Sequence, residues 1–129
     1  MTNDEKEVIV TDKAPKAIGP YSAGIRSGNM VFTAGQLGID PATGNLVPGG
    51  VEAETRQALQ NLKNILESGG SSLAQVIKTT VFLRDMHDFS RMNSVYGEFF
   101  PENPPARSTV QVAALPKDAA VEIEAIGVV

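Results

Sequence analysis

Apolar side chains recur at helical spacing in two segments of the chain. In the first segment they lie at positions i, i+1, i+4, i+7 and i+8 and line one helix face: Ala58, Leu59, Leu62, Ile65 and Leu66. In the second segment the corresponding face carries Phe89, Met92, Tyr96 and Phe99. Gly69 and Gly70 end the first predicted helix, and Pro101 stops the second. The pattern therefore predicts two amphipathic helices.

Runs rich in β-branched residues and bounded by turn residues predict about six strands. These runs are Glu7 to Thr11, Ser22 to Arg26, Met30 to Ala34, Val76 to Leu83, Ser108 to Ala113 and Val121 to Val129. The segment from Gln36 to Gly50 is predicted as a loop. The resulting order β-ββ-α-β-α-ββ indicates an α+β fold with both helices on one face of a mixed sheet. Because the chain shows no internal repeat and no long linker, we expect residues 1–129 to form a single domain.

Two of the predicted strands are apolar on both faces. In the last strand one face carries Val121, Ile123, Ala125 and Val129, and the other carries Glu122, Glu124, Ile126 and Val128. In the 76–83 run, Ile77, Val81 and Leu83 are predicted to lie opposite Val76 and Phe82. Because two helices cover only one face of such a sheet, we expect another subunit to cover the second face.

Composition and charge exclude several kinds of chemistry and partner. The chain has no cysteine and a single histidine, so a thiol nucleophile, a disulfide framework and a multi-histidine metal site are excluded within one chain. The formal net charge of −4 argues against a nucleic-acid partner. The polar N-terminal segment from Met1 to Lys6 is not typical of a signal peptide, and no apolar run approaches the roughly 18 residues that a membrane helix needs. We therefore expect a cytoplasmic protein without membrane contact.

Arg107 is a candidate for binding an anionic group. Pro104 and Pro105 stiffen the backbone before it, so the direction of the guanidinium is restricted at the entrance to a predicted strand. A guanidinium held in a fixed direction suits the bidentate binding of a carboxylate. Glu122 opens the next predicted strand, and two neighbouring strands would bring these side chains close together. On spacing alone, a structural salt bridge between the strands explains the pair better than a catalytic role does.

Several further stretches form a pattern that covers the chain from about Ala14 to Val129. They read AIGPYS (17–22), TAGQ (33–36), VIKTTVFL (76–83), PARS (105–108), AALPKD (113–118) and VEIEA (121–125). With these motifs, in this order and at this spacing, the chain resembles the archetypal subgroup of the reactive intermediate deaminase family, also called Rid or YjgF-like.

The resemblance implies a fold, an assembly and an activity. It implies a chorismate-mutase-like fold and a homotrimer around a central sheet barrel, with active sites in the clefts between subunits. It also implies metal-independent hydrolysis, without a cofactor, of 2-imino acids and their enamine tautomers, such as 2-aminoacrylate and 2-iminobutanoate, to 2-keto acids and ammonia. PLP-dependent dehydratases acting on serine and threonine release such species, so a functional link to those enzymes is expected.

The resemblance also assigns roles to individual residues. Arg107 is expected to bind the substrate carboxylate and Glu122 to activate the attacking water as a general base. Gly35 is expected to leave room for the substrate, and Tyr21 to border the pocket from the neighbouring subunit. Substrate-binding positions are also assigned to Asn93, Ala34 and Thr109. Thr109 stands where many members carry cysteine, so a thiol cannot be the nucleophile here. Ala34 stands where some members carry serine.

Two other functions remain open at this point. One is a non-catalytic trimer that binds small carboxylates as a regulator. The other is an endoribonuclease or translation inhibitor, activities attributed to some family members, against which the net charge and the single histidine argue.

Overall fold

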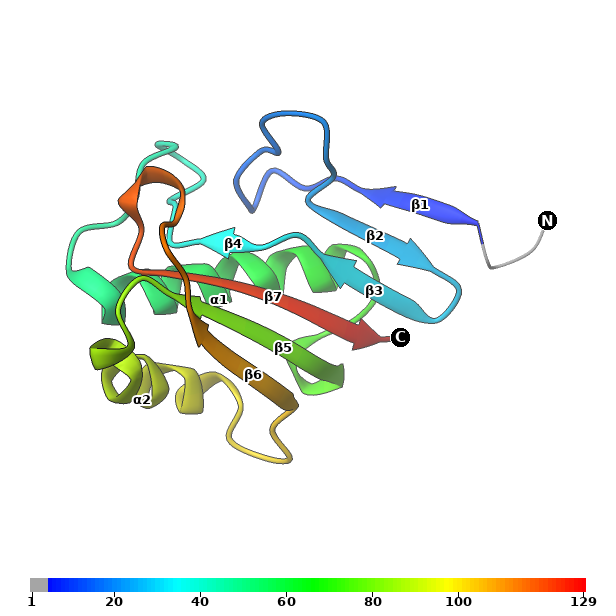
Figure 1. The fold of residues 1–129 in the computed structure, drawn as a ribbon. Helices are drawn as coiled ribbons and strands as arrows, with labels where there is room; N and C mark the ends of the chain where they lie inside the picture. The colour runs from blue at the N-terminus through cyan, green and yellow to red at the C-terminus, as the bar shows by residue number, and fades with distance from the viewer. Residues whose placement is uncertain (1–4) are drawn as a thin grey trace.

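The computed structural model describes residues 5–129, so the first four residues of the polar N-terminal segment lie outside the described residues. Figure 1 shows a twisted sheet with two helices. The strands are β1 (Lys6–Ile9), β2 (Gly24–Ser27), β3 (Met30–Thr33), β4 (Gln36–Leu37), β5 (Val76–Leu83), β6 (Ala106–Gln111) and β7 (Val121–Val128). The helices are α1 (Gly50–Ser68) and α2 (Phe89–Phe99), with short 3₁₀ turns at Leu73–Gln75 (η1), Met86–Asp88 (η2) and Pro116–Asp118 (η3).

The sheet is mixed, and its strand order explains why both helices share a face. The order is β1-β2-β3-β7-β5-β6, and β4 also pairs with β7. β5 and β6 are parallel, whereas the other pairs are antiparallel. β4 and β5 both run antiparallel to β7 and therefore run in the same direction as each other. The crossovers through α1 and α2 advance the same way across the sheet, and right-handed crossovers of this kind place their helices on one face (Figure 1).

The core lies between this helical layer and the sheet. The predicted apolar stripe of α1 is confirmed, because all five of its residues are completely buried: Ala58, Leu59, Leu62, Ile65 and Leu66. They belong to one cluster with sheet residues that include Val31, Val81, Leu83, Val121 and Ile123. Burying each of the larger side chains contributes about 1.5–3 kcal/mol. The ends of both helices, before Gly69 and before Pro101, are also as predicted.

The segment predicted as a loop from Gln36 to Gly50 contains β4 and an isolated bridge between Ile39 and Leu46, so this prediction is wrong in part. A strand of two residues is too short to show an alternating pattern. Its position is fixed from α1 by Asn61, whose buried amide donates to the carbonyls of Leu37 at 3.2 Å and Ile39 at 2.9 Å. Gln57 in turn donates to the Asn61 side-chain oxygen at 2.9 Å.

At the start of β5, the side chains that face the core also differ from the prediction. Val76 is buried and Ile77 is 46 % exposed, the reverse of a strict alternation. The register between β5 and β7 shifts between Val76 and Lys78, and such a β-bulge turns the first side chain to the other face. The next apolar residues, Val81 and Leu83, face the core as predicted. β6 begins at Ala106, two residues earlier than predicted, and Val129 lies beyond the end of β7.

The face of the sheet opposite the helices carries a continuous apolar row. Val8, Ile25, Phe32 and Ile126 are paired in register across β1, β2, β3 and β7. Val8 is 57 % exposed and Phe32 is 39 % exposed. We call these four residues the open-face row. Apolar surface of this extent is typical of an interface.

Candidate active site

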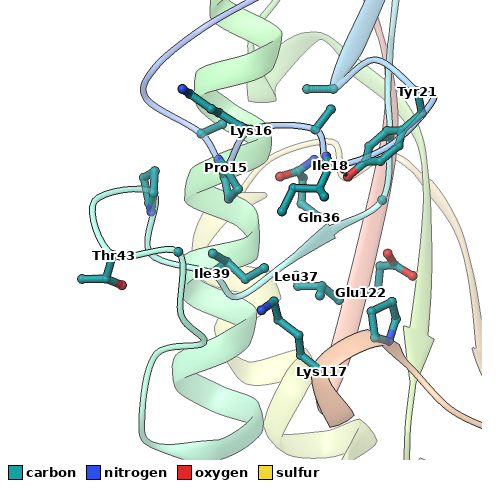
Figure 2. Close-up of a pocket in the computed structure, with 18 of the residues that line it drawn as sticks. Pro15, Lys16, Ile18, Tyr21, Gln36, Leu37, Ile39, Thr43, Lys117 and Glu122 are labelled. Atoms are coloured by element: carbon teal, nitrogen blue, oxygen red, sulfur yellow. Dashed lines mark hydrogen bonds between the residues drawn. The ribbon is translucent and has the colours of Figure 1, made fainter.

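The main pocket lies beside β4 and the start of β7, and Figure 2 shows its walls. One wall is the loop that carries Pro15, Ile18 and Tyr21, another is the 39–44 loop, and the third is η3 with Lys117. The cavity has a volume of about 860 Å³. Four residues predicted for the site line this one pocket: Tyr21, Ala34, Gly35 and Glu122.

Glu122 places a carboxylate in this pocket from β7, where it pairs with Leu37 of β4 and Phe82 of β5. Burial raises the pKa of the Glu122 carboxyl above its ordinary value, and the negative charge of Glu124 raises it further. A carboxylate with a raised pKa is a stronger base than an exposed one. Glu122 therefore has the chemistry that proton abstraction from water requires.

Gly35 is needed where it stands because of Glu122. A Cβ added at position 35 would lie 2.8 Å from the Glu122 carboxyl carbon and 2.8 Å from its Oε2 atom, closer than such atoms approach in proteins. Any other residue at position 35 would therefore displace the carboxylate. The neighbouring Ala34 is held by its backbone N–H, which donates to the carbonyl of Ala23 at 2.8 Å.

Tyr21 and Gln36 also line the pocket. The Tyr21 hydroxyl accepts a hydrogen bond from the backbone N–H of Ile18 at 3.4 Å, which links two points of the same wall. The side chain of Gln36 extends beneath this wall, as Figure 2 shows, and the residue is only 6 % exposed. Its amide makes no hydrogen bond to another described residue, so it is available to a ligand or water. Gln36 belongs to the TAGQ motif (33–36), but the sequence alone did not identify it as a site residue. Its burial beside the pocket is the signal that identifies it, and burial is known only from the structure. We call Tyr21, Ala34, Gly35, Gln36 and Glu122 the pocket half-site.

Arg107 lies elsewhere, on the edge strand β6. Its Nη1 atom donates to Asn93 Oδ1 of α2 at 2.7 Å. Its guanidinium carbon lies 4.7 Å from the centroid of the Tyr96 ring and 5.5 Å from that of Phe89. Thr109 is on the same face of β6, and its hydroxyl is buried without a hydrogen-bond partner among residues 5–129. We call Arg107, Asn93 and Thr109 the arginine half-site.

The two half-sites lie on opposite faces of the sheet, which corrects the expectation that the strands of Arg107 and Glu122 are neighbours. β5 separates β6 from β7. Arg107 is in register with Thr79 of β5, and Thr79 with Ala125 of β7, so Arg107 shares the helix-covered face with these two buried residues. Glu122 is an odd number of residues from Ala125 and points the other way. One chain therefore does not bring Arg107 and Glu122 together, and no salt bridge joins them.

Two structural features are absent from the described residues. Among residues 5–129, no group of three or more His, Asp or Glu side chains is arranged to hold a metal ion. Within the same range, no helix combines the length and the apolar character needed to cross a bilayer.

Comparison with known proteins places this architecture in a family. Residues 11–129 match the family described as Endoribonuclease L-PSP. The chain is 58 % identical over 121 residues to a RutC family protein of Pyrococcus horikoshii, covering 94 % of this chain and 96 % of the relative. It is 50 % identical over 128 residues to the 2-iminobutanoate/2-iminopropanoate deaminase of Bos taurus, covering 99 % of this chain and 93 % of the relative.

A solved structure agrees with these matches. The crystal structure of E. coli TdcF with bound serine is similar to this fold with a TM-score of 0.91 and 47 % identity, covering 95 % of this chain and 98 % of that one. The chain therefore belongs to the Endoribonuclease L-PSP family, also known as the YjgF/RutC/Rid family.

Proposed function

We propose that the protein hydrolyses short 2-imino acids and their enamine tautomers, 2-aminoacrylate and 2-iminobutanoate among them, to 2-keto acids and ammonia. The observation that carries this proposal is a set of two half-sites with complementary chemistry, one a carboxylate binder and the other a base in a pocket. The deaminase name of relatives at about 50 % identity supports it.

The proposed reaction begins with a protonated imine, whose carbon is already electrophilic. Water adds to this carbon and forms a carbinolamine, while Glu122 accepts a proton from the water. The proton then returns to the nitrogen, and the carbon–nitrogen bond breaks as Glu122 accepts the remaining hydroxyl proton. The 2-keto acid leaves, and ammonia takes this proton from Glu122 and leaves as ammonium. No electron is transferred to an external acceptor, so the reaction requires no redox cofactor. Because protonation already makes the imine carbon electrophilic, the proposed mechanism also uses no metal.

Arg107 is proposed to hold the substrate carboxylate throughout these steps. One Nη1 hydrogen bond is used by Asn93, which leaves the other donors of the guanidinium for the ligand. Each charge-assisted hydrogen bond of this kind contributes about 1.5–3 kcal/mol to binding.

We further propose that the complete site forms between two copies of the chain. Because Arg107 and Glu122 point to opposite faces of one sheet, a second copy is needed to bring an Arg107 to each Glu122. The exposed open-face row and the edge strand β6 supply surface for such packing. A contact between different patches forms a ring when its rotation closes, and the family resemblance favours a homotrimer with its sites at the interfaces.

The proposal has a metabolic and cellular setting. PLP-dependent dehydratases acting on serine and threonine would supply the imines, and the cytoplasm is the compartment proposed for both steps. The function would be the removal of a reactive intermediate before it modifies other proteins.

The test supplies imine generated in situ by a threonine dehydratase and follows 2-keto acid release above the spontaneous rate. The wild-type protein is expected to accelerate release. Arg107→Ala is expected to lower kcat/KM about 100-fold through the lost carboxylate bonds. Glu122→Gln is expected to lower kcat about 100-fold, as for removal of a general base. Arg56→Ala, whose ion pair with Glu98 is exposed, and the exposed Glu67→Gln serve as charge-matched controls and should stay within about twofold of wild type.

The same experiment separates the alternative functions. A protein that binds 2-ketobutanoate but never accelerates imine loss would be a carboxylate-binding regulator. RNA cleavage that survives repurification and disappears in Arg107→Ala would support the endoribonuclease named in the family description. The net charge of −4 argues against RNA as a substrate.

A further inference from the structure

The guanidinium of Arg107 rests on two aromatic rings of α2. Its central carbon lies 4.7 Å from the centroid of the Tyr96 ring and 5.5 Å from the centroid of the Phe89 ring. We call these two rings the aromatic shelf. A guanidinium stacked on an aromatic face is attracted by the ring and keeps its N–H groups free along its edge.

Tyr96 is itself fixed by a buried hydrogen bond. Its hydroxyl lies 2.7 Å from the Thr79 hydroxyl of β5, and both side chains are buried. Thr79 is also the residue in register with Arg107 on the neighbouring strand. The Tyr96 ring therefore connects α2 to Thr79 of the sheet, which lies beside Arg107 on the neighbouring strand. Burial raises the pKa of the Tyr96 phenol, which stays neutral at working pH.

The remaining contact of Arg107 sets the rotation of its plane. Asn93 lies one helical turn before Tyr96 on α2 and accepts the Nη1 hydrogen bond at 2.7 Å. The aromatic shelf limits movement perpendicular to the guanidinium plane, and Asn93 limits rotation within it. A cation restrained in both ways loses less conformational entropy when it binds a ligand.

We propose that Tyr96 is a positioning residue that orients Arg107 for the carboxylate of the substrate. This inference rests on the proposed function, because it assigns Arg107 the carboxylate. Tyr96 does not itself contact the substrate. Tyr96 sets the position of the Arg107 guanidinium and restricts its movement. Thr79 in turn holds the Tyr96 ring in place.

The test compares substitutions that keep or remove the ring. Tyr96→Phe retains the ring and loses the hydroxyl with its bond to Thr79, whereas Tyr96→Leu removes the ring. Phe89→Leu removes the more distant ring and is a milder change in case Tyr96→Leu does not fold. Phe99→Leu, a partly buried aromatic of the same helix with no contact to Arg107, is the matched control. The measurements are KM and kcat for imine hydrolysis, and the Kd of 2-ketobutanoate by calorimetry.

The expected result is a change in carboxylate affinity without a matching change in turnover. Tyr96→Leu should raise both KM and Kd about 10-fold and leave kcat within about twofold, because the carboxylate contact is equal in the ground and transition states. Phe89→Leu should raise Kd about threefold. Tyr96→Phe, which keeps the ring but loses the bond from Thr79 that fixes it, should raise Kd about twofold, less than Tyr96→Leu. Phe99→Leu should bind 2-ketobutanoate with wild-type Kd.

Three results would overturn the proposal or separate it from the proposed function. A wild-type Kd in both Tyr96→Leu and Phe89→Leu overturns the positioning role. A lower kcat at unchanged KM, shared with Phe99→Leu, shows a general packing role and also overturns it. If the wild-type protein binds 2-ketobutanoate but does not hydrolyse imine, the proposed function fails, while the Kd comparison still decides the role of Tyr96.

Discussion

A Cβ at position 35 would lie 2.8 Å from the carboxyl carbon of Glu122, so Gly35 and Glu122 are mutually dependent. Gly35→Ala should displace the carboxylate and lower kcat at least 10-fold, a part of the loss expected for removal of a general base. Steady-state kinetics of imine hydrolysis measure this effect. Gly97→Ala is the matched control, because nothing lies within 4 Å of a Cβ there and the site is an exposed position of α2. It should keep wild-type kcat and stabilise the protein by about 0.5–1 kcal/mol. An unchanged kcat in Gly35→Ala would show that the carboxylate position does not matter.

Ionisation of the Glu122 carboxyl should lower the stability of the protein. Its pKa is raised in the folded state, chiefly by burial, so the cost of ionisation is fully present above the folded-state pKa. Glu122→Gln should therefore be more stable than wild type at neutral pH, and the difference should shrink as pH falls towards the ordinary pKa of glutamate. Chemical denaturation of both proteins across this pH range measures it. A difference that grows at low pH would contradict the raised pKa.

The same raised pKa gives turnover a pH dependence. Because the base must be ionised, kcat should fall as pH is lowered through the Glu122 pKa in the complex. Together these effects predict that one substitution at Glu122 raises stability and removes activity.

Much of the helical layer could be predicted from sequence, because its signal is periodic. The stripe from Ala58 to Leu66 lies on one face at the helical period and is buried as that period implies. The relation between Arg107 and Glu122 could not be predicted this way. The crossover through α2 places β6 beyond β5, so β6 and β7, which follow each other in sequence, are not neighbours in the sheet. β4, the bulge at Val76 and the burial of Gln36 depend on tertiary contacts that no local pattern encodes.

Asn61 should be important for both stability and the pocket. Asn61→Ala removes the donor to the carbonyls of Leu37 and Ile39, and the buried carbonyl groups lose their partner. We expect a loss of about 1–3 kcal/mol in the free energy of unfolding. Asn64→Ala is the matched control on the same helix. The Asn64 amide donates to the Lys13 carbonyl at 2.8 Å in an exposed bond and accepts a long bond from Gln60 at 3.5 Å. Asn64→Ala should cost at most about 1 kcal/mol. Equal losses in the two variants would argue against a special role for Asn61.

The open-face row should be needed for association. Phe32→Lys places a charge in the middle of this row, between Ile25 and Ile126. Sedimentation should show dissociation towards the monomer, with loss of activity at the same protein concentrations. Glu67→Lys adds a lysine to the exposed outer surface of α1 near its C-terminus, where a cation is tolerated, and should leave the assembly unchanged. A Phe32→Lys protein that keeps the assembly and activity of the wild type would rule out the open-face row as the interface.

The most direct test of the central claim is complementation between two inactive variants. Arg107→Ala and Glu122→Gln are unfolded together in equal amounts, refolded to allow mixed assemblies, and assayed for imine hydrolysis. If each site takes Arg107 from one copy and Glu122 from another, random mixing restores about a quarter of the wild-type activity, because one in four interfaces carries both intact residues. Each variant refolded alone should stay inactive. A mixture that remains as inactive as its two parents, although mixed assemblies have formed, would contradict a site shared between chains.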